Sequence, residues 1–543
     1  MRFLSLLLLC GLISCNTNTK TQVDLIITNA NIYTVDDSFS TATAMAIGEG
    51  LVVKVGTNEA INEAYQSEQV VDAQGKTLVP GLIDAHAHLL NLGISMQQAD
   101  LVGTTSAEDV IARVKAFQER NNVVFISGRG WDQNDWEVKE FPTKEQLDAV
   151  FPDTPVALRR IDGHALWVNS KALELAGITA QTKVPGGEVI LKDGQPSGVL
   201  VDGPMRLIGE VMPEEAGSFY IKSLIDAEAA CVALGLTTVN DAGLDKQSIL
   251  AIDSLQQAGA MDLRVYAMVS NYPENLDYFL DRGIIKTDRL NVRSVKVYGD
   301  GALGSRGAAL RAPYSDQAGH FGAMITTQED LMALAKRIAA AGYQMNTHAI
   351  GDSANVAVLR AYKEALDGKT DARWKVEHAQ IVSAEDFDYF SKNIIPSVQP
   401  THATSDMYWA EDRVGPDRIL GAYSFKTLLD KAGIIALGTD FPVEQVNPMY
   451  TYYAAVARKD LEGYPDGGFR ADQALSREEA LRGMTIWAAY SNFEDQEKGS
   501  LEPGKVADFV LLSKDIVTVA ESEIPTTEVL ATYIAGKQVY TKD

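Results

Sequence analysis

Eight short apolar runs, separated by stretches of helical character, dominate the middle of this 543-residue chain. Apolar runs that alternate with helical stretches indicate βα units and a parallel sheet. Eight units make a (β/α)8 TIM barrel, whose active site forms at the carboxyl ends of the strands. Most of these runs end in polar residues. The runs cover residues 77–89, 235–243, 262–271, 292–301, 342–351, 374–382, 394–402 and 434–443.

Three other parts of the chain do not follow this βα pattern. Residues 23–76 and 497–543 read as short β-strands, which predicts one small β-sandwich domain built from both chain ends. The barrel then spans residues 77–496. Roughly 145 residues separate the first two apolar runs, far more than a loop contains. We therefore expect an inserted subdomain at about residues 100–225, placed as a roof over the site.

The charge balance narrows the classes of partner. With 48 Lys and Arg against 73 Asp and Glu, the formal net charge is −25. Binding to nucleic acid or docking on anionic lipid needs clustered basic residues. We therefore expect no nucleic-acid partner, and membrane contact only through a lipid anchor. Hydrophobic residues make up 46% of the chain, enough for a large core. A large acidic globular enzyme that acts on a small molecule is the simplest expectation.

The first fifteen residues, MRFLSLLLLCGLISC, have the pattern of an export signal. One basic residue precedes an apolar run that is too short to span a bilayer. The end of the run resembles a bacterial lipobox, which predicts cleavage after residues 1–14, a lipid on Cys15 and a tether over 15–22. The protein would then be a lipoprotein anchored in the bacterial cell envelope, periplasmic or on the outer surface. An ordinary secretory signal is the alternative.

Two histidines end the first apolar run, in GLIDAHAHLL. His86 and His88 are two residues apart, so on a strand both side chains face the same side and can converge on one ion. The alternative is a pair of hydrogen-bonded polar histidines. The Pro-Gly turn and the buried run before them favour a position at a strand end.

Other metal-ligating residue types end later runs. His348 lies in NTHAIGD, His378 in KVEHAQ and Asp440 in LGTDFPV. Imidazole and carboxylate ligands suit zinc, manganese, iron or nickel. Lys296, inside VRSVKVYGDG, is costly at an inward position unless it is paired or modified. A neutral amine that adds CO₂ becomes an anionic bridge between two cations; an outward lysine, or one paired with Asp300, is the alternative.

These motifs together resemble the amidohydrolase superfamily, in its family-3 branch, often called YtcJ-like. The matching stretches include VDAQGKTLVPGLIDAHAHL, VKVYGDGALGSRGAAL, NTHAIGD, KVEHAQ, LGTDFPV and LEPGKVADFVLL. In the insertion, DGHALWVNSKALELAGI and PGGEVILKDGQPSGVL match as well. The likeness runs from about residue 23 to 540. One departure is Gly307, where the branch usually has threonine after GSR, and this affects the pocket rather than the metals.

The resemblance implies a hydrolase with one or two divalent ions, zinc first and manganese, iron or nickel as alternatives. It implies that His86, His88 and Asp440 hold the more buried ion and that His348 and His378 hold the second. Lys296, if carboxylated, would bridge the two. The implied reaction is cleavage of a non-peptide C–N bond, amide or formamide-like, by a metal-bound hydroxide. Asp440 would act as general base and then as general acid.

Residues expected to face the substrate come from four motifs. His164 (DGHALW) and His402 (QPTHAT) match motifs of the branch and are expected to orient the substrate or stabilise an oxyanion. Trp131 and Asp132 (GRGWDQ) are expected in the pocket. Arg306 (GSRGAA) is expected to bind a carboxylate in bidentate fashion or to pair with an acidic neighbour. The alternative for each histidine is a buried polar residue that braces a loop.

Two other functions stay open. The same barrel supports ester, lactone or isomerisation chemistry, since a fold does not fix a reaction. A non-catalytic envelope lipoprotein that binds a small molecule is the third hypothesis, which the full set of metal-ligating residues disfavours. The family also suggests a homodimer.

Overall fold

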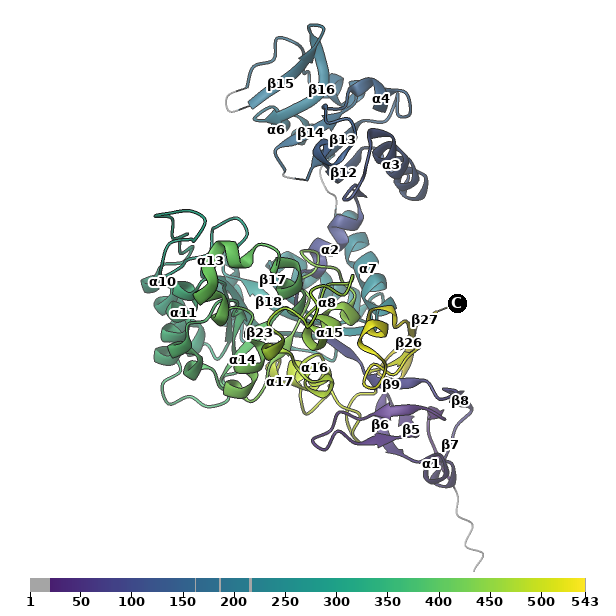
Figure 1. Ribbon diagram of the computed structural model, residues 1–543. Coiled ribbons are helices and arrows are strands. Elements are labelled where there is room, and N and C mark those ends of the chain that lie inside the picture. Colours follow the sequence, from purple (N-terminus) through teal and green to yellow (C-terminus); the bar gives the residue numbers. More distant parts are fainter. Residues whose placement is uncertain (1–19, 162, 185–186, 214–216, 543) are drawn as a thin grey trace, which may run out of the picture.

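The computed structural model describes residues 20–161, 163–184, 187–213 and 217–542. They form three parts: a barrel in the middle, a β-sandwich on one side and an inserted domain on the other (Figure 1). Cys15 and the predicted signal and tether up to residue 19 lie outside the described residues, so the lipid anchor stays a prediction. Among the described residues, no helix has the length and apolar character needed to cross a bilayer.

Eight parallel strands form the barrel in chain order, which confirms the predicted fold class. A short antiparallel strand, β19 (Ile285–Lys286), adds to β20. The eight strands are β10 (Leu82–Ala87), β17 (Leu236–Leu244), β18 (Arg264–Ser270), β20 (Leu290–Tyr298), β21 (Gln344–Ala349), β22 (Trp374–His378), β23 (Ile394–Val398) and β24 (Ala436–Leu437).

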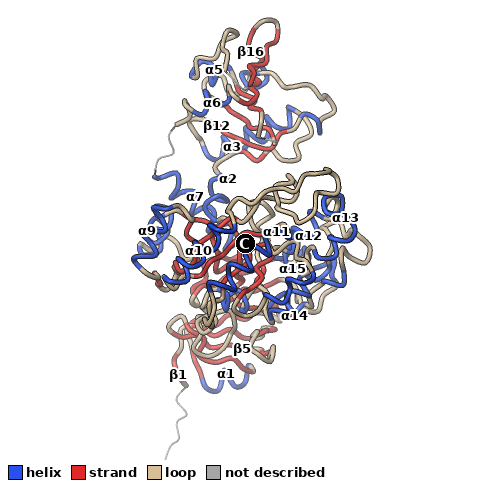
Figure 2. The backbone as a smooth tube through the Cα atoms, turned by 90° about the vertical axis from the view of Figure 1, so that its left-hand side faces the viewer, coloured by secondary structure: helices blue, strands red, loops and turns tan. Residues whose placement is uncertain are grey.

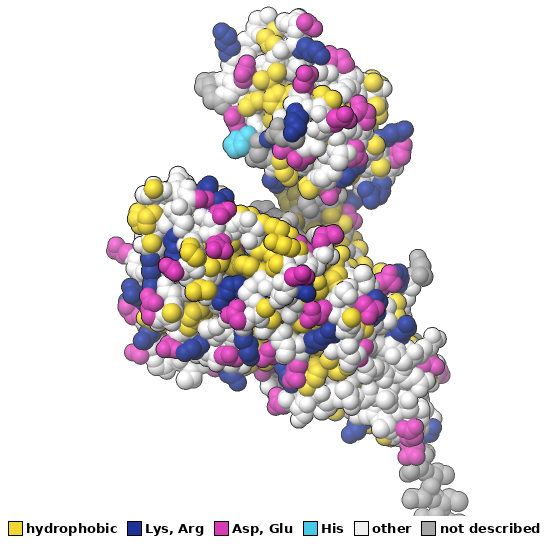
Figure 3. Space-filling model, in the orientation of Figure 1, with side chains coloured by type: hydrophobic (Ala, Val, Ile, Leu, Met, Phe, Trp, Pro, Cys, Tyr) yellow, Lys and Arg dark blue, Asp and Glu magenta, His cyan; other side chains and the backbone are white. Residues whose placement is uncertain are grey.

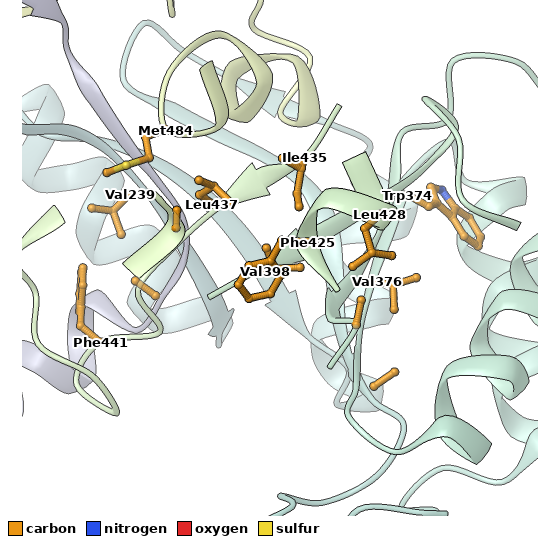
Figure 4. Close-up of a cluster of buried hydrophobic side chains, with 14 of the residues drawn as sticks. Val239, Trp374, Val376, Val398, Phe425, Leu428, Ile435, Leu437, Phe441 and Met484 are labelled. Carbon is orange, nitrogen blue, oxygen red and sulfur yellow. The ribbon is translucent and has the colours of Figure 1, made fainter. Parts of the chain in front are cut away.

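Helices surround these strands (Figure 2). Their apolar faces pack on the outward-facing strand residues, such as Val376 and Val398 against Phe425 and Leu428 of α14 (Phe425–Ala432; Figure 4). The helices after β10 are α2 (Leu89–Met96), α7 (Gly217–Ala233), α8 (Lys246–Gln257), α9 (Pro273–Arg282), α10 (Gln328–Ala340), α11 (Asp352–Ala365), α12 (Pro400–Asp406), α13 (Ala410–Arg418), α14 (Phe425–Ala432), α15 (Pro448–Ala457), α16 (Arg477–Gly483) and α17 (Ile486–Ser491).

Alternate residues of each strand point into the barrel. Several of these inward side chains are polar and bond to one another. Asn240 exchanges two hydrogen bonds with Asn492, at 2.7 and 2.8 Å. The amine of Lys375 donates to the same Asn492 side chain at 3.0 Å. All three side chains are fully buried. The inward layers therefore form a hydrogen-bonded network beneath the carboxyl ends of the strands.

The barrel closes where β24 meets β10. Asp440 N–H donates to His86 O at 2.7 Å, and His88 N–H donates to Phe441 O at 2.8 Å. The buried Asp84 carboxylate accepts from the Thr439 hydroxyl at 2.7 Å, and from the Thr439 and His86 amides at 3.1 Å. Any Cβ at Gly438 would lie 2.5 Å from His86 N, so this close approach needs glycine.

Strands from both chain ends build the sandwich, in two sheets ordered β6-β5-β2-β8 and β27-β26-β25-β9-β3-β4. The first predicted run, 77–89, is thus two strands: β9 pairs with β25 in the sandwich, and only β10 belongs to the barrel. The strands are β2 (Leu25–Thr28), β3 (Asn31–Tyr33), β4 (Thr41–Ala42), β5 (Ala44–Gly48), β6 (Leu51–Gly56), β8 (Gln69–Asp72), β9 (Thr77–Pro80), β25 (Phe509–Leu512), β26 (Val529–Ile534) and β27 (Lys537–Thr541). Helix α1 (Asn58–Ala64) and the pair β1 (Thr21–Gln22) and β7 (Tyr65–Gln66) lie beside them.

The inserted domain stands away from the barrel on a narrow neck, rather than over the strand ends as a roof (Figures 1–3). Helices α2 and α7 form the neck and pack so closely that a Cβ at Gly93 would lie 2.0 Å from Ser223 O. The sheet of the inserted domain has the order β11-β12-β13-β14-β16-β15. The elements are β11 (Ala99–Asp100), α3 (Ala107–Asn121), β12 (Ile126–Trp131), α4 (Lys144–Asp148), β13 (Val156–Arg160), β14 (Ala165–Val168), α5 (Ser170–Leu175), β15 (Gly187–Lys192), β16 (Gln195–Asp202) and α6 (Met205–Gly209).

Replacing Asp84 by alanine tests the closure of the barrel. The change leaves three buried donors without their acceptor, and each unsatisfied donor costs about 1–3 kcal/mol. We expect Asp84→Ala to lower the free energy of unfolding by at least about 2 kcal/mol, measured by urea denaturation. Asp388→Ala removes a carboxylate that is 80% exposed and serves as the control. Equal stability of both variants would contradict this role of Asp84.

Candidate metal centre

The carboxyl ends of several barrel strands bring most of the predicted ligands together. His86 is the penultimate residue of β10 and His88 follows that strand, while His348 and His378 come from the neighbouring strands β21 and β22. The ring centroids of His86 and His378 are 4.8 Å apart, and those of His348 and His378 are 4.5 Å apart. Residues distant in sequence thus form one imidazole cluster, at the end of the barrel where active sites form.

Asp440 lies at the centre of this cluster. Its Oδ1 is 3.2 Å from Nε2 of His88 and 3.6 Å from Nε2 of His86, and Oδ1 has no hydrogen-bond partner among the described residues. Its Oδ2 lies 3.2 Å from Nε2 of His402. One carboxylate therefore turns its two oxygens toward different histidines.

Two groups of side chains have the donor spacing that a metal ion requires. The first is His86, His88 and Asp440, and the second is His378, His402 and Asp440. His402, expected in a substrate-facing role, thus joins the second group, where the family resemblance implied His348. His348 stays beside His378, but its Nε2 lies 3.6 Å from Asp300 and makes no hydrogen bond in the described part of the chain.

Side-chain oxygens hold three of these rings from behind, at Nδ1. Glu377 contacts His86 at 2.5 Å, Gln399 contacts His378 at 2.7 Å, and Glu444 contacts His402 at 2.9 Å. Such partners fix the orientation and tautomer of metal-binding histidines. None of these three partners was predicted from the sequence. Glu377 and Gln399 stand within the quoted motifs KVEHAQ and QPTHAT, but strand alternation alone would not place Glu377 beside His86.

Positive φ values change the direction in which two side chains of the cluster leave the backbone. His378 has φ 72° and Asp440 has φ 65°, in the left-handed region that non-glycine residues rarely adopt. Such backbone strain persists only where the surrounding structure enforces it, and it gathers at functional sites. At β22 it allows Glu377 and His378, adjacent in sequence, to face the same cluster.

Burial and charge set the protonation of the cluster. Burial, followed by neighbouring positive groups, lowers the pKa of His86 and His378 and brings that of His348 to about 3. Burial opposes the charged form of His402 as well, but Asp440 and Glu444 raise its pKa to about 10. For Asp440, His402 and His88 outweigh burial and hold the pKa well below its usual range. The ionised Asp440 and the neutral rings of His86, His348 and His378 are in the form that binds a metal, whereas His402 would first have to lose its extra proton.

Lys296 projects from β20 into the same cluster. Its Nζ lies 3.1 Å from Nε2 of His86, and the side chain is almost fully buried. Burial lowers the pKa of this amine. The paired alternative, with Asp300, does not describe this contact: the Asp300 carboxylate accepts from the amides of Ala309, Ile350 and Gly351.

The donor set fits a divalent ion. Imidazole nitrogens and a carboxylate are ligands for zinc and related metals. In the described structure the buried His348 Nε2 and Asp440 Oδ1 lack hydrogen-bond partners, as expected for atoms whose partner is a cation.

Three predicted substrate-facing residues lie in the inserted domain, which the neck separates from the cluster. Trp131 is fully buried in the core of that domain, where its indole N–H donates to Leu158 O at 2.8 Å. Asp132 pairs with Arg160. His164, whose side chain is 73% exposed, contacts Asp202 at 2.7 Å. The structure does not bring these side chains to the metal cluster.

Arg306 pairs with an acidic neighbour, which is one of the two roles that its sequence motif allowed. Its guanidinium donates to both oxygens of Asp316, at 3.1 and 2.7 Å. Asp316 also accepts from Arg413. Arg306 therefore fixes the loop after β20 in this structure, rather than presenting a free fork to a substrate.

The model of the amidohydrolase family matches residues 69–540. The chain belongs to this family. It is 33% identical to the protein LONG AFTER FAR-RED 3 of Arabidopsis thaliana (95% of this chain, 91% of the relative). It is 30% identical to the putative amidohydrolase YtcJ of Bacillus subtilis strain 168 (94% and 98%). It is 29% identical to the N-substituted formamide deformylase of Arthrobacter pascens (94% and 97%). The predicted resemblance is thereby confirmed.

A solved structure extends the likeness to the fold. An uncharacterized metal-dependent hydrolase from Pyrococcus horikoshii OT3 matches with a TM-score of 0.75 and 29% identity, covering 92% of this chain and 99% of that one. Family and neighbour together support a metal-dependent hydrolase.

Metal content tests the cluster. We expect purified wild-type protein to retain divalent metal, measured by elemental mass spectrometry after dialysis. Asp440→Ala removes the carboxylate common to both groups, so metal affinity should fall by more than the roughly 100-fold typical of losing an outer partner. His164→Ala, a histidine of the inserted domain, is the matched control and should retain the metal. Full metal binding by Asp440→Ala would contradict the assignment.

Proposed function

We propose that this amidohydrolase cleaves a non-peptide C–N bond of a small molecule, an amide or N-substituted formamide, with one or two divalent ions as cofactor. The observation that carries the proposal is Asp440, which directs its two oxygens to two groups of imidazoles at the barrel mouth. The similarity to an N-substituted formamide deformylase over almost the whole chain supports the bond type.

In this proposal the histidines and Asp440 hold the metal, and Asp440 also transfers the proton. His86, His88 and Asp440 would hold one ion, with His378 and either His402 or His348 at the second. When bound, the metal lowers the pKa of water and polarises a carbonyl. Asp440, ionised and within the cluster, accepts the proton of the attacking water and returns it to the leaving nitrogen. This return explains why an amine, a poor leaving group when unprotonated, can depart.

His402 adds a positive charge beside Asp440. Asp440 and Glu444 stabilise the charged form of His402 and raise its pKa to about 10, which favours a ring with a proton on each nitrogen. In that form Nε2–H donates toward Asp440 and the site, where it can stabilise negative charge on the carbonyl oxygen. As a metal ligand the ring would instead be neutral, so the number of bound ions decides its role.

Lys296 is proposed as the carboxylated bridge. A neutral amine adds CO₂ and releases one proton, which leaves a carbamate with two oxygens. Burial favours the neutral form that this addition needs. The Nζ position, 3.1 Å from His86 Nε2, puts the added group within the cluster.

Product analysis tests the reaction. Metal-loaded protein is incubated with N-substituted formamides and N-acyl amines, and the released primary amine is quantified. We expect amine release that a chelator abolishes, and a fall in kcat of roughly 10²–10⁴-fold in Asp440→Asn. Release of an alcohol from esters, with no amine from amides, would favour ester or lactone chemistry. Metal binding without any turnover would favour a binding protein.

Lys296→Ala separates the bridge from a structural role. We expect this variant to lose bound metal, and we expect a small carboxylic acid added to the buffer to restore part of it by replacing the carbamate. Metal content measured with and without the acid provides the result. Unchanged metal content in Lys296→Ala would contradict the bridge while leaving the hydrolase proposal intact.

A further inference from the structure

A buried carboxylate holds His86 from the side opposite to the cluster. Oε2 of Glu377 lies 2.5 Å from Nδ1 of His86, and both side chains are fully buried. The other ring nitrogen, Nε2, faces Lys296 at 3.1 Å and Asp440 at 3.6 Å. The ring is therefore fixed with Nδ1 on the carboxylate and Nε2 toward the centre.

The register of β22 places Glu377 there. Trp374 and Val376 face outward, into the apolar layer between the strands and the helices (Figure 4). Lys375 and Glu377 alternate with them and face the barrel interior, where Lys375 donates to Asn492. Because His378 has φ 72°, it turns toward the mouth without displacing Glu377. Glu377 is thus a fixed part of the interior layer beneath the metal centre.

The environment of Glu377 points to His86 as its main partner. Its Oε1 has no hydrogen-bond partner among the described residues, so the 2.5 Å contact through Oε2 is the close contact of this carboxylate. Lys375 Nζ donates elsewhere, to Asn492 at 3.0 Å. A buried carboxylate is costly unless a specific partner compensates for its lost hydration. Holding His86 is the use of Glu377 that the structure shows.

We propose that Glu377 is a positioning residue for the metal centre: its carboxylate keeps the proton of His86 on Nδ1 and so presents the Nε2 lone pair to a divalent ion. The inference rests on the proposed function, because the ion is the one that the hydrolase would use. Outer partners of this kind strengthen metal binding by about 10–100-fold. Gln399 and Glu444 hold His378 and His402 in the same way, at 2.7 and 2.9 Å.

A purely structural Glu377 would give a different result. If it only balanced the charge of the interior, its loss would lower stability and leave metal affinity unchanged. Glu494 provides the matched comparison: it is buried in the same protein, but among the described residues it pairs with Lys286 and Lys498, each at 2.7 Å, and with no histidine. Breaking either carboxylate's contacts disturbs a buried charge, but only Glu377 contacts a proposed metal ligand.

The experiment measures the Zn²⁺ dissociation constant of the full chain by competition with a chelating dye, alongside thermal unfolding of the apo protein. Glu377→Gln keeps an acceptor oxygen but removes the charge, so we expect roughly 10-fold weaker binding; Glu377→Ala removes the acceptor, and roughly 100-fold is expected. Glu494→Gln should unfold at lower temperature and bind Zn²⁺ as tightly as the wild type. The visible spectrum of the Co²⁺-loaded proteins should change in the Glu377 variants only.

Each outcome separates the two proposals. Wild-type affinity in both Glu377 variants would overturn the positioning role and leave the proposed hydrolase standing. A wild-type protein that binds no metal would overturn the proposed function, and the positioning role with it. If Glu377→Ala does not fold, Glu377→Asp, which keeps the charge but shortens the reach, should bind Zn²⁺ more weakly than the wild type, and equal affinity would again overturn the role.

Discussion

The contact between the first and last barrel strands fixes the geometry of the candidate metal centre. β24 has only two residues in regular strand geometry, Ala436–Leu437, so closure depends on bonds beyond it. The amides of Asp440 and His88 supply them, each donating to a backbone oxygen of the opposite segment. Because Asp440 and both histidines of the HxH pair belong to these segments, the bonds that close the barrel also set the distances within the first ligand group.

Polar side chains fill the interior of the barrel below this candidate metal centre. Carboxylates, amines and amides that would weaken an ordinary core occupy the inward positions of the strands, where each needs a partner. Asn492 links Asn240 to Lys375, and Glu377 holds His86 above them. Apolar packing is instead concentrated outside the strands, against the helices (Figure 4). The barrel thus separates stability, supplied mainly by its outer layer, from the orientation of ligands, supplied by its inner one.

The sequence was sufficient for the barrel and for most of the cluster because both depend on local patterns. Apolar runs mark strands, and polar residues at their ends meet at one face of a barrel. Glu377 was missed because, on a regular strand, an inward His378 would put Glu377 on the outer face. The positive φ of His378, which lets both side chains face the cluster, is not visible in the pattern of residue types. The placement of Trp131, Asp132 and His164 was missed for another reason. A motif predicts that its residues share a local structure, but not how a whole inserted domain sits on its neck.

The way the clustered side chains are held also affects which residues a substrate can meet. The proposed metal-ligating side chains come from strand ends and the turns that follow, and β-sheet hydrogen bonds hold these segments. The cluster is nevertheless open to approach, since the His88 side chain is 20% exposed and that of His402 is 13% exposed. Tyr298 is 40% exposed and its ring lies 5.8 Å from that of His348, so an exposed aromatic side chain lies beside the cluster. We therefore expect substrate contacts to come from exposed residues at the barrel mouth, such as Tyr298, rather than from the buried side chains that hold the histidines.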